Sequence, residues 1–470
     1  MAIIGIILFS AVDGKESGRP VTMLLADTIP NFHLLREFKG QTITKSNGII
    51  SLSTGLDNDY YFLDSQSRTG YFYAEARVGE FKNTTTKRFP LNIAIVLDRS
   101  GSMKGEKMRQ AKQAAKSIIE KLTAEDVVSV IMYDHEVTLI QPAVKVTAKD
   151  SIYKKIDAIE ERGSTNLWGG TEKGFEQVKQ FYQSSAINRV LLISDGLANS
   201  GLTNARVICN KVLQWKDGEG ISLSTFGVGL DYNEVLMTDM AETGAGNYYF
   251  INDPQQMSAI LEKELNGLAT IAAQNVKLQI RMPAGIQLLK FHAVKADTKK
   301  ELIEINFRDL FSADTKGVLV QFRLLDNTAI PFVFRSTLSY TDVADNGLKI
   351  LETENKLQPL KNLDSFITHY NRNVLVQMVL AQANEVMEKA MAETDKGLYE
   401  GARLTLMRNA AYLQRYEPLV RTSVELQKMT AVNNAYLAQL QQANKLNSDS
   451  LKLIQKQNRQ EAYKIRVKKQ

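Results

Sequence analysis

Residues from about 91 to 267 alternate apolar segments of strand length with amphipathic segments of helix length. The first apolar segment, LNIAIVL at 91–97, is continuous, which is typical of a parallel strand that is buried on both faces. This alternation predicts an α/β domain with a doubly wound, mostly parallel sheet and helices on both of its faces. We expect further strands at 127–132, 189–194 and 221–226, and helices at about 107–121, 148–160, 169–183, 203–215, 232–242 and 254–266.

Three polar loops in this segment carry candidate metal ligands. One follows the first strand, one precedes the helix at 169–183, and one follows the strand at 189–194. Because ligands of such sheets bind at the carboxyl ends of the strands, we expect the loops to meet at one edge. Any one of their side chains could simply cap a helix, but five hard oxygen donors together favour Mg²⁺ or Mn²⁺ over zinc or copper. The five residues are Asp98, Ser100, Ser102, Thr165 and Asp195.

The DRSGSM sequence of the first loop, the threonine of GSTNL and the aspartate of SDG resemble the metal-ion-dependent adhesion site of a von Willebrand factor A domain. The resemblance covers about residues 91–267 and includes all five positions in family order. It implies a bound Mg²⁺ (or Mn²⁺ or Ca²⁺) whose direct ligands are the three hydroxyls, with the two carboxylates acting largely through water. It also implies that a Glu or Asp of a partner protein completes the coordination. The resemblance therefore implies metal-dependent protein recognition.

Enzymatic function is the less favoured interpretation. The four histidines form no zinc-binding spacing, and neither a P-loop nor a nucleophile elbow is present. We expect no histidine beside the three loops, because His135 follows a different strand, so a metal-dependent hydrolase lacks a base. The single cysteine, Cys209, is expected to pack in the domain interior rather than to act as a nucleophile. Trp168, next to the second loop, is also expected to pack, and contact with a partner is the alternative.

The flanks predict two further modules. Residues 20–90 and 268–345 read as strands, and we expect them to form the two parts of one β-sandwich into which the domain at 91–267 is inserted. The crossings would lie at 83–88 and 265–274, and two separate small β units are the alternative. Residues 364–470 predict an α-helical bundle, with helices at about 364–393, 395–415 and 418–444. These flanks resemble those of bacterial A-domain proteins.

The net charge of +6 is concentrated at the C-terminus. Residues 445–470 contain eight Lys or Arg and two Asp or Glu, so the rest of the chain is balanced and nucleic-acid binding is not expected. The basic tail is predicted to be a solvated helix, and contact with anionic lipid or an acidic partner is the alternative. The apolar start at 2–11 is too short to span a bilayer; residues 1–19 are either a signal-peptide remnant or a disordered start.

These features favour a metal-dependent protein-binding protein that lies in the cell envelope or is secreted, with no transmembrane span. The alternative is a regulatory subunit that couples its A domain to a cytoplasmic ATPase machine, as chelatase-type A domains do. A cleaved N-terminus would favour the first interpretation.

Overall fold

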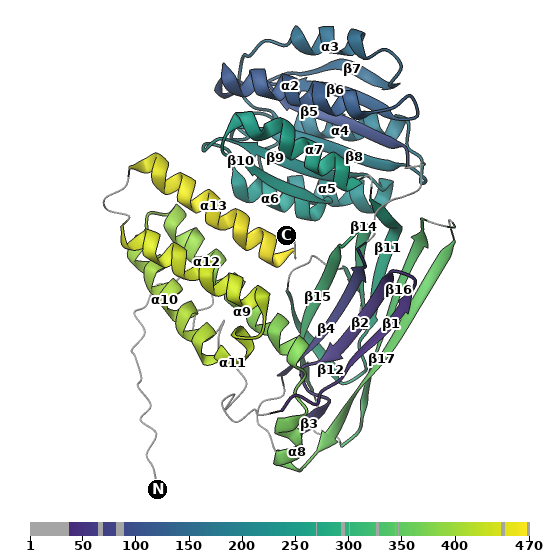
Figure 1. Cartoon of the computed structure of the whole chain (residues 1–470), viewed down its shortest axis with the longest axis vertical. Coiled ribbons are helices and arrows are strands. Elements are labelled where there is room, and N and C mark those ends of the chain that lie inside the picture. Colours follow the sequence, from purple (N-terminus) through teal and green to yellow (C-terminus); the bar gives the residue numbers. More distant parts are fainter. Residues whose placement is uncertain are drawn as a thin grey trace.

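The computed structural model describes residues 37–467 except 64–68, 81–88, 269, 293–296, 300, 326–328, 344, 346 and 443–446. An α/β domain lies at one end of the molecule, and a β-sandwich and a group of helices lie side by side beneath it (Figure 1). The expectations for residues 1–19 and for the crossing at 83–88 lie outside the described residues.

The sheet of the α/β domain has the strand order β10-β9-β8-β5-β6-β7. All neighbouring strands are parallel except β7, which pairs antiparallel with β6 and was not expected. Every residue of the four inner strands is buried, as their continuous apolar sequences predict. The strands are β5 (Leu91–Asp98), β6 (Val127–Tyr133), β7 (Val137–Lys145), β8 (Ile187–Ser194), β9 (Ser222–Val228) and β10 (Ala245–Ile251).

Helices cover both faces of this sheet and enclose two apolar cores. On one face, α2 and α7 pack with residues such as Met108 and Leu261. On the other face, α4, α5 and α6 pack with residues such as Phe175 and Met237. The doubly wound fold is therefore confirmed. The helices are α2 (Glu106–Lys121), α3 (Lys149–Asp157), α4 (Leu167–Gln180), α5 (Ala205–Glu219), α6 (Glu234–Thr243) and α7 (Met257–Leu268).

The β-sandwich combines strands from before and after the α/β domain. One sheet has the order β1-β2-β4-β15-β12, and the other β13-β14-β11-β16-β17-β3. Antiparallel pairing of β4 with β15 joins the two parts of the chain, so insertion of the α/β domain into one sandwich is confirmed. The strands are β1 (Thr42–Asn47), β2 (Ile50–Leu56), β3 (Tyr60–Phe62), β4 (Thr69–Val78), β11 (Ile271–Arg281), β12 (Ile286–His292), β13 (Asp297–Lys299), β14 (Leu302–Phe311), β15 (Thr315–Leu324), β16 (Phe332–Asp342) and β17 (Leu348–Leu360).

Two details of the sandwich differ from expectation. The second crossing is shorter than 265–274, because α7 continues to Leu268 and β11 begins at Ile271. The strand segment also extends beyond residue 345, since β17 pairs with β16 over Leu348–Leu357.

The C-terminal helices begin and end at other residues than predicted. The expected helix at 364–393 is two helices, α8 (Leu363–Thr368) and α9 (Arg372–Asp395), which are capped by Asn362 and Asn371. The helix expected from 395 begins at Tyr399, because Asp395 is the last residue of α9. The helix expected from 418 begins at Val424 after the cap Ser423, because Pro418 lies in the short α11. The others are α10 (Tyr399–Arg415), α11 (Glu417–Val420), α12 (Val424–Gln441) and α13 (Ser448–Arg466).

The basic C-terminal helix α13 is not solvated along its length. It lies between the α/β domain and the other helices (Figure 1). Lys456, Arg459 and Arg466 are largely buried and form ion pairs with acidic residues elsewhere in the chain, so the prediction of a solvated helix was wrong for them. Lys452 also forms an ion pair, with Asp231, but stays exposed. Within the described ranges, no helix is both long and apolar enough to cross a bilayer.

Candidate metal site

The five expected ligands lie on segments that meet at one edge of the sheet. Asp98 is the last residue of β5, and Ser100 and Ser102 follow it in a tight turn. Asp195 directly follows β8, which is parallel to β5 and adjacent to it. Because parallel neighbours end at the same side of a sheet, these two loops face each other.

Hydrogen bonds connect the first loop to the third. Ser102 Oγ donates to Asp195 Oδ1 at 2.7 Å and lies 3.0 Å from Ser100 Oγ. The backbone N–H of Ser100 donates to Asp98 Oδ1 at 2.8 Å, which folds the turn back toward the strand end. Asp98, Ser100 and Asp195 are buried and Ser102 is exposed, so the group opens to solvent on the Ser102 side.

Thr165 joins this group from the second loop, just before α4. A Cβ placed on Gly196 would lie 2.8 Å from Thr165 Oγ1 and 3.3 Å from Asp98 Oδ2, so the threonine hydroxyl and the carboxylate line one small space beside that glycine. The backbone of Thr165 is held there by its N–H, which donates to Asn199 Oδ1 at 2.8 Å. The structure thus brings all five predicted side chains together.

A positive charge would stabilise the two carboxylates of this group. Burial raises the pKa of Asp98, and the negative charge of Asp195 raises it further, whereas hydrogen bonds from Ser100 and Ser194 lower it. Asp98 Oδ2 also accepts from Ser194 Oγ at 2.6 Å and Tyr133 Oη at 3.3 Å. A cation at this edge would offset the cost of holding two carboxylates close together.

Lys107 supplies one such charge and was missed by the sequence analysis. It lies in the first turn of α2, and its Nζ is 2.5 Å from Asp195 Oδ2 and 3.3 Å from the Ser102 carbonyl. The available signal was a lysine in the first turn of the helix that follows the DRSGSM loop.

The donor set and the space fit a small, hard cation. Carboxylate and hydroxyl oxygens are the ligands that Mg²⁺ prefers, whereas the imidazole and thiolate ligands typical of zinc are not among the five side chains. Glycine at position 196 allows Thr165 and Asp98 to approach this closely, because a Cβ there would lie 2.8 Å from Thr165 Oγ1.

Comparison with known families decides what this domain is. The family model of the von Willebrand factor type A domain matches residues 92–263. The chain contains a von Willebrand factor type A domain. The match includes all three loops of the candidate site and ends within α7.

Relatives share this A domain and, in part, its surroundings. The chain is 31% identical over 191 residues to YfbK of Escherichia coli strain K12, an alignment covering 40% of this chain and 33% of that protein. It is 23% identical over 335 residues to inter-alpha-trypsin inhibitor heavy chain H2 of Mus musculus, covering 70% of this chain and 32% of the relative. The chain thus spans about a third of the length of these two relatives.

Solved structures share the fold over most of the chain. A von Willebrand factor type A protein from Catenulispora acidiphila aligns with a TM-score of 0.65 and 15% identity, over 83% of this chain and 92% of that one. The ArnB paralog VWA2 from Sulfolobus acidocaldarius aligns with a TM-score of 0.60 and 16% identity, over 89% and 98%. Because these alignments exceed the A domain, the similarity of fold includes parts of the flanking modules.

One expectation about the A domain was wrong. His135 lies beside the second loop, because a Cβ on Gly163 would be 2.5 Å from its Nδ1. This nitrogen is 3.2 Å from Asp134, whose carboxylate also pairs with Arg99 at 2.9 Å and Arg162 at 3.0 Å. The contacts of Asp134 therefore join the first loop, through Arg99, to Arg162 just before the second loop.

Trp168 and Cys209 pack in the A domain as expected. Both belong to the apolar core between the sheet and α4, α5 and α6, with exposed fractions of 4% and 7%. Lys211 lies 5.5 Å from the centre of the Trp168 ring, which further covers it.

Proposed function

We propose that the A domain binds Mg²⁺ (or Mn²⁺ or Ca²⁺) and uses it to recognise an acidic side chain of a protein partner. The proposed ligands are Asp98, Ser100, Ser102, Thr165 and Asp195. The observation that carries the proposal is the convergence of these side chains from three separate loops, with Thr165 and Asp98 both lying close against Gly196. Similarity to heavy chains of inter-alpha-trypsin inhibitor supports a role in protein–protein interaction.

The chain's own residues account for selectivity toward an acidic group. A bound divalent ion supplies an electrophilic centre with a preference for oxygen ligands. We infer that the three hydroxyls are the direct ligands and that the two carboxylates act largely through water, so the cation keeps an affinity for a carboxylate of the partner. Ser102 is the exposed ligand, and we infer that the partner carboxylate approaches on its side. A cell-envelope or secreted location is part of the proposal, because recognition of this kind suits an extracellular partner.

Removing the cation should reverse the interaction rather than merely weaken it. Without the ion, Asp98 and Asp195 would face the incoming carboxylate. Two like charges about 4 Å apart repel by about 4 kcal/mol near a protein surface. EDTA should therefore abolish partner binding, and the double change Ser100→Ala with Ser102→Ala should have the same effect.

Calorimetric titration of the full chain with MgCl₂ or MnCl₂ tests the metal step. We expect one ion per chain, and loss of binding in Asp98→Ala and in Thr165→Ala. Asp157→Ala is the matched control, because Asp157 lies on α3 and pairs with Lys116 on the surface. Unchanged binding in Asp98→Ala would refute the site.

Partner recognition is tested by affinity capture from the native cell with full-length protein, with and without EDTA. Capture that persists in EDTA and in the double serine variant would contradict the proposal.

A further inference from the structure

Helix α13 is packed between two modules and contributes to the core of each. Leu453 and Tyr463, together with Val467 just after the helix, pack with the apolar core of the A domain. Ile454, Ala462 and Ile465 pack with the core of the helical bundle. Figure 1 shows α13 in this intermediate position, beside α9 and α12 on one side and the A domain on the other. The helix is therefore a physical link between the modules.

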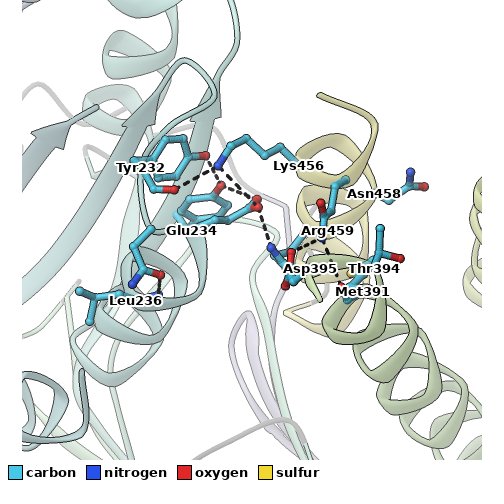
Figure 2. Close-up of polar contacts among 12 residues, drawn as sticks. Tyr232, Glu234, Leu236, Met391, Thr394, Asp395, Lys456, Asn458 and Arg459 are labelled. Carbon is cyan, nitrogen blue, oxygen red and sulfur yellow. Dashed lines mark hydrogen bonds and ion pairs between the residues drawn. The ribbon is translucent and has the colours of Figure 1, made fainter. Parts of the chain in front are cut away.

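Buried charges reinforce this link. Arg459 Nη1 donates to Glu234 Oε2 at 3.0 Å, and its Nη2 donates to Asp395 Oδ2 at 2.7 Å, so one guanidinium joins α6 of the A domain to α9 of the bundle (Figure 2). The Glu234 side chain is only 2% exposed. Tyr248 Oη also donates to its Oε1 at 2.8 Å, which gives the buried carboxylate a partner on each oxygen.

The lysines of α13 contact the loop between β9 and α6, residues 229–233. Lys456 Nζ lies 3.6 Å from the centre of the Tyr232 ring and donates to the Tyr232 carbonyl at 3.3 Å (Figure 2). One turn earlier, Lys452 Nζ lies 2.8 Å from Asp231 Oδ1. Docking of α13 therefore fixes the middle of this loop through two cations.

The beginning of the same loop, Gly229, lies against Lys107, which is beside the candidate metal site. Gly229 has a positive φ of 74°, and a Cβ on it would lie 3.3 Å from Lys107 Nζ. That ammonium is the one that pairs with Asp195 at 2.5 Å. Thus Lys107 lies between a proposed metal ligand and the loop that α13 covers.

Asp231 is influenced by the lysines of α13 and by Lys107 of α2. Its pKa is lowered, first by the hydrogen bond from Lys452 and further by the positive charges of Lys107 and Lys456. Its side chain is 67% exposed, so it is free to accept a different cation without leaving water.

We propose that this loop couples cation binding at the A-domain edge to the docking of α13, so that binding of the cation weakens the docking. A divalent ion held by Asp195 repels the Lys107 ammonium from that carboxylate. Asp231, two residues after Gly229, is the alternative acceptor, and there Lys107 competes with Lys452. Metal binding thus loosens α13, and this inference rests on the metal site of the proposed function.

The coupling must act equally in both directions. If the ion weakens α13 docking by some factor, then a docked α13 weakens ion binding by the same factor. The bundle would in this way hold the A domain in a state of low metal affinity, and a partner that engages the metal would release the helix.

Hydrogen exchange of the full chain, followed by mass spectrometry, tests the first direction without any variant. Peptides from α13 should exchange at least about five-fold faster in saturating MgCl₂ than in EDTA, the lower end of typical coupling factors. Unchanged or slower exchange would overturn the coupling. Calorimetry on the same sample separates the two proposals: if Mg²⁺ binds and α13 does not respond, only the coupling fails, and if no Mg²⁺ binds, both fail.

Variants of α13 and of the loop test the reverse direction, in which a docked α13 weakens Mg²⁺ binding. Lys452→Met removes an exposed partner of Asp231 and should tighten Mg²⁺ binding by a similar factor. Lys464→Met is the control on the same helix, because Lys464 pairs with Glu461 of α13 itself. Asp231→Asn removes the alternative acceptor, so Mg²⁺ should no longer accelerate exchange in α13. Equal affinities in Lys452→Met and Lys464→Met, or a persisting response in Asp231→Asn, would overturn the proposed route.

Discussion

The guanidinium of Arg189 lies 2.8 Å from a carboxylate oxygen of Glu264, and each side chain is only 1% exposed. Arg189 lies near the start of β8, and Glu264 lies on α7, so the pair joins sheet and helix at the end of the A domain opposite the metal site. Ser224, Asn247 and Tyr249 also donate to the carboxylate, at 2.6 to 2.8 Å. These bonds offset part of the cost of burying the Glu264 carboxylate.

Glu264→Ala should destabilise the A domain by about 3–5 kcal/mol, because it leaves the Arg189 guanidinium buried without a counter-charge. Both tryptophans, Trp168 and Trp215, lie in the A domain, so fluorescence during urea unfolding reports on this module. Glu262→Ala is the control on the same helix: Glu262 pairs with Lys121 near the surface, and its loss should cost less than about 1 kcal/mol. Similar losses in the two variants would contradict the role assigned to the buried pair.

Gly196→Ala should abolish Mg²⁺ binding while leaving the fold intact. The added methyl would lie 2.8 Å from Thr165 Oγ1 and 3.3 Å from Asp98 Oδ2, so it would occupy the space between two proposed ligands. Gly218→Ala is the control, because a Cβ there meets nothing within 4 Å. Calorimetry measures the binding and circular dichroism the fold. Normal Mg²⁺ affinity in Gly196→Ala would show that the cation lies elsewhere.

The A domain could be predicted from sequence because its signals are local. Apolar strands alternate with amphipathic helices. The rule that ligands bind at the carboxyl ends of parallel strands then places Asp98, Thr165 and Asp195 together, although they are far apart in the chain. Lys107 and His135 were not placed at the site, because their positions depend on how a helix and a neighbouring strand pack against the loops. The rule identifies which loops meet but not which other side chains reach them.

The C-terminal region was harder to predict because its partners are distant in sequence. The acids that pair with α13, such as Glu234 and Glu242, lie more than 200 residues earlier, so the sequence showed only an excess of positive charge. Similarly, the break between α8 and α9 depends on Asn371, whose amide donates to the Gln41 carbonyl at 2.7 Å while its oxygen caps α9. Neither the ion pairs of α13 nor the contact of Asn371 with Gln41 has a local sequence signal.

Stability should fall as the pH rises from about 4 to about 7 because of Asp57. Burial raises the pKa of this carboxyl to about 7, although its Oδ1 accepts from the Tyr71 N–H at 2.8 Å. The folded state therefore holds a proton that the unfolded state releases near its ordinary pKa, so the contribution is full below about pH 4 and is lost as the pH rises toward 7.

The matched variant for this effect is Asp57→Asn, which cannot titrate. The difference in unfolding free energy between wild type and variant should change by up to about 4 kcal/mol between pH 4 and pH 8, with wild type losing stability. Chemical unfolding at several pH values, followed by circular dichroism, measures it. A difference that stays constant with pH would contradict the raised pKa.

Tyr463 provides the test of whether α13 belongs to the folded A domain. Its ring is 3% exposed and meets the ring of Tyr248 edge-on at 5.6 Å, and its Oη accepts from the Tyr248 N–H at 3.1 Å. Tyr463→Phe should cost about 1–3 kcal/mol, because it leaves that buried N–H without its acceptor. Tyr463→Ala should cost about 3–5 kcal/mol, because it also removes the packed ring.

Tryptophan fluorescence should detect both losses although the tryptophans lie outside α13. Tyr182→Ala, at a side chain that is 38% exposed, should change the transition little. If Tyr463→Ala makes α13 sensitive to protease but leaves the A-domain transition unchanged, the helix covers the domain without stabilising it, and its two-sided packing does not link their stabilities.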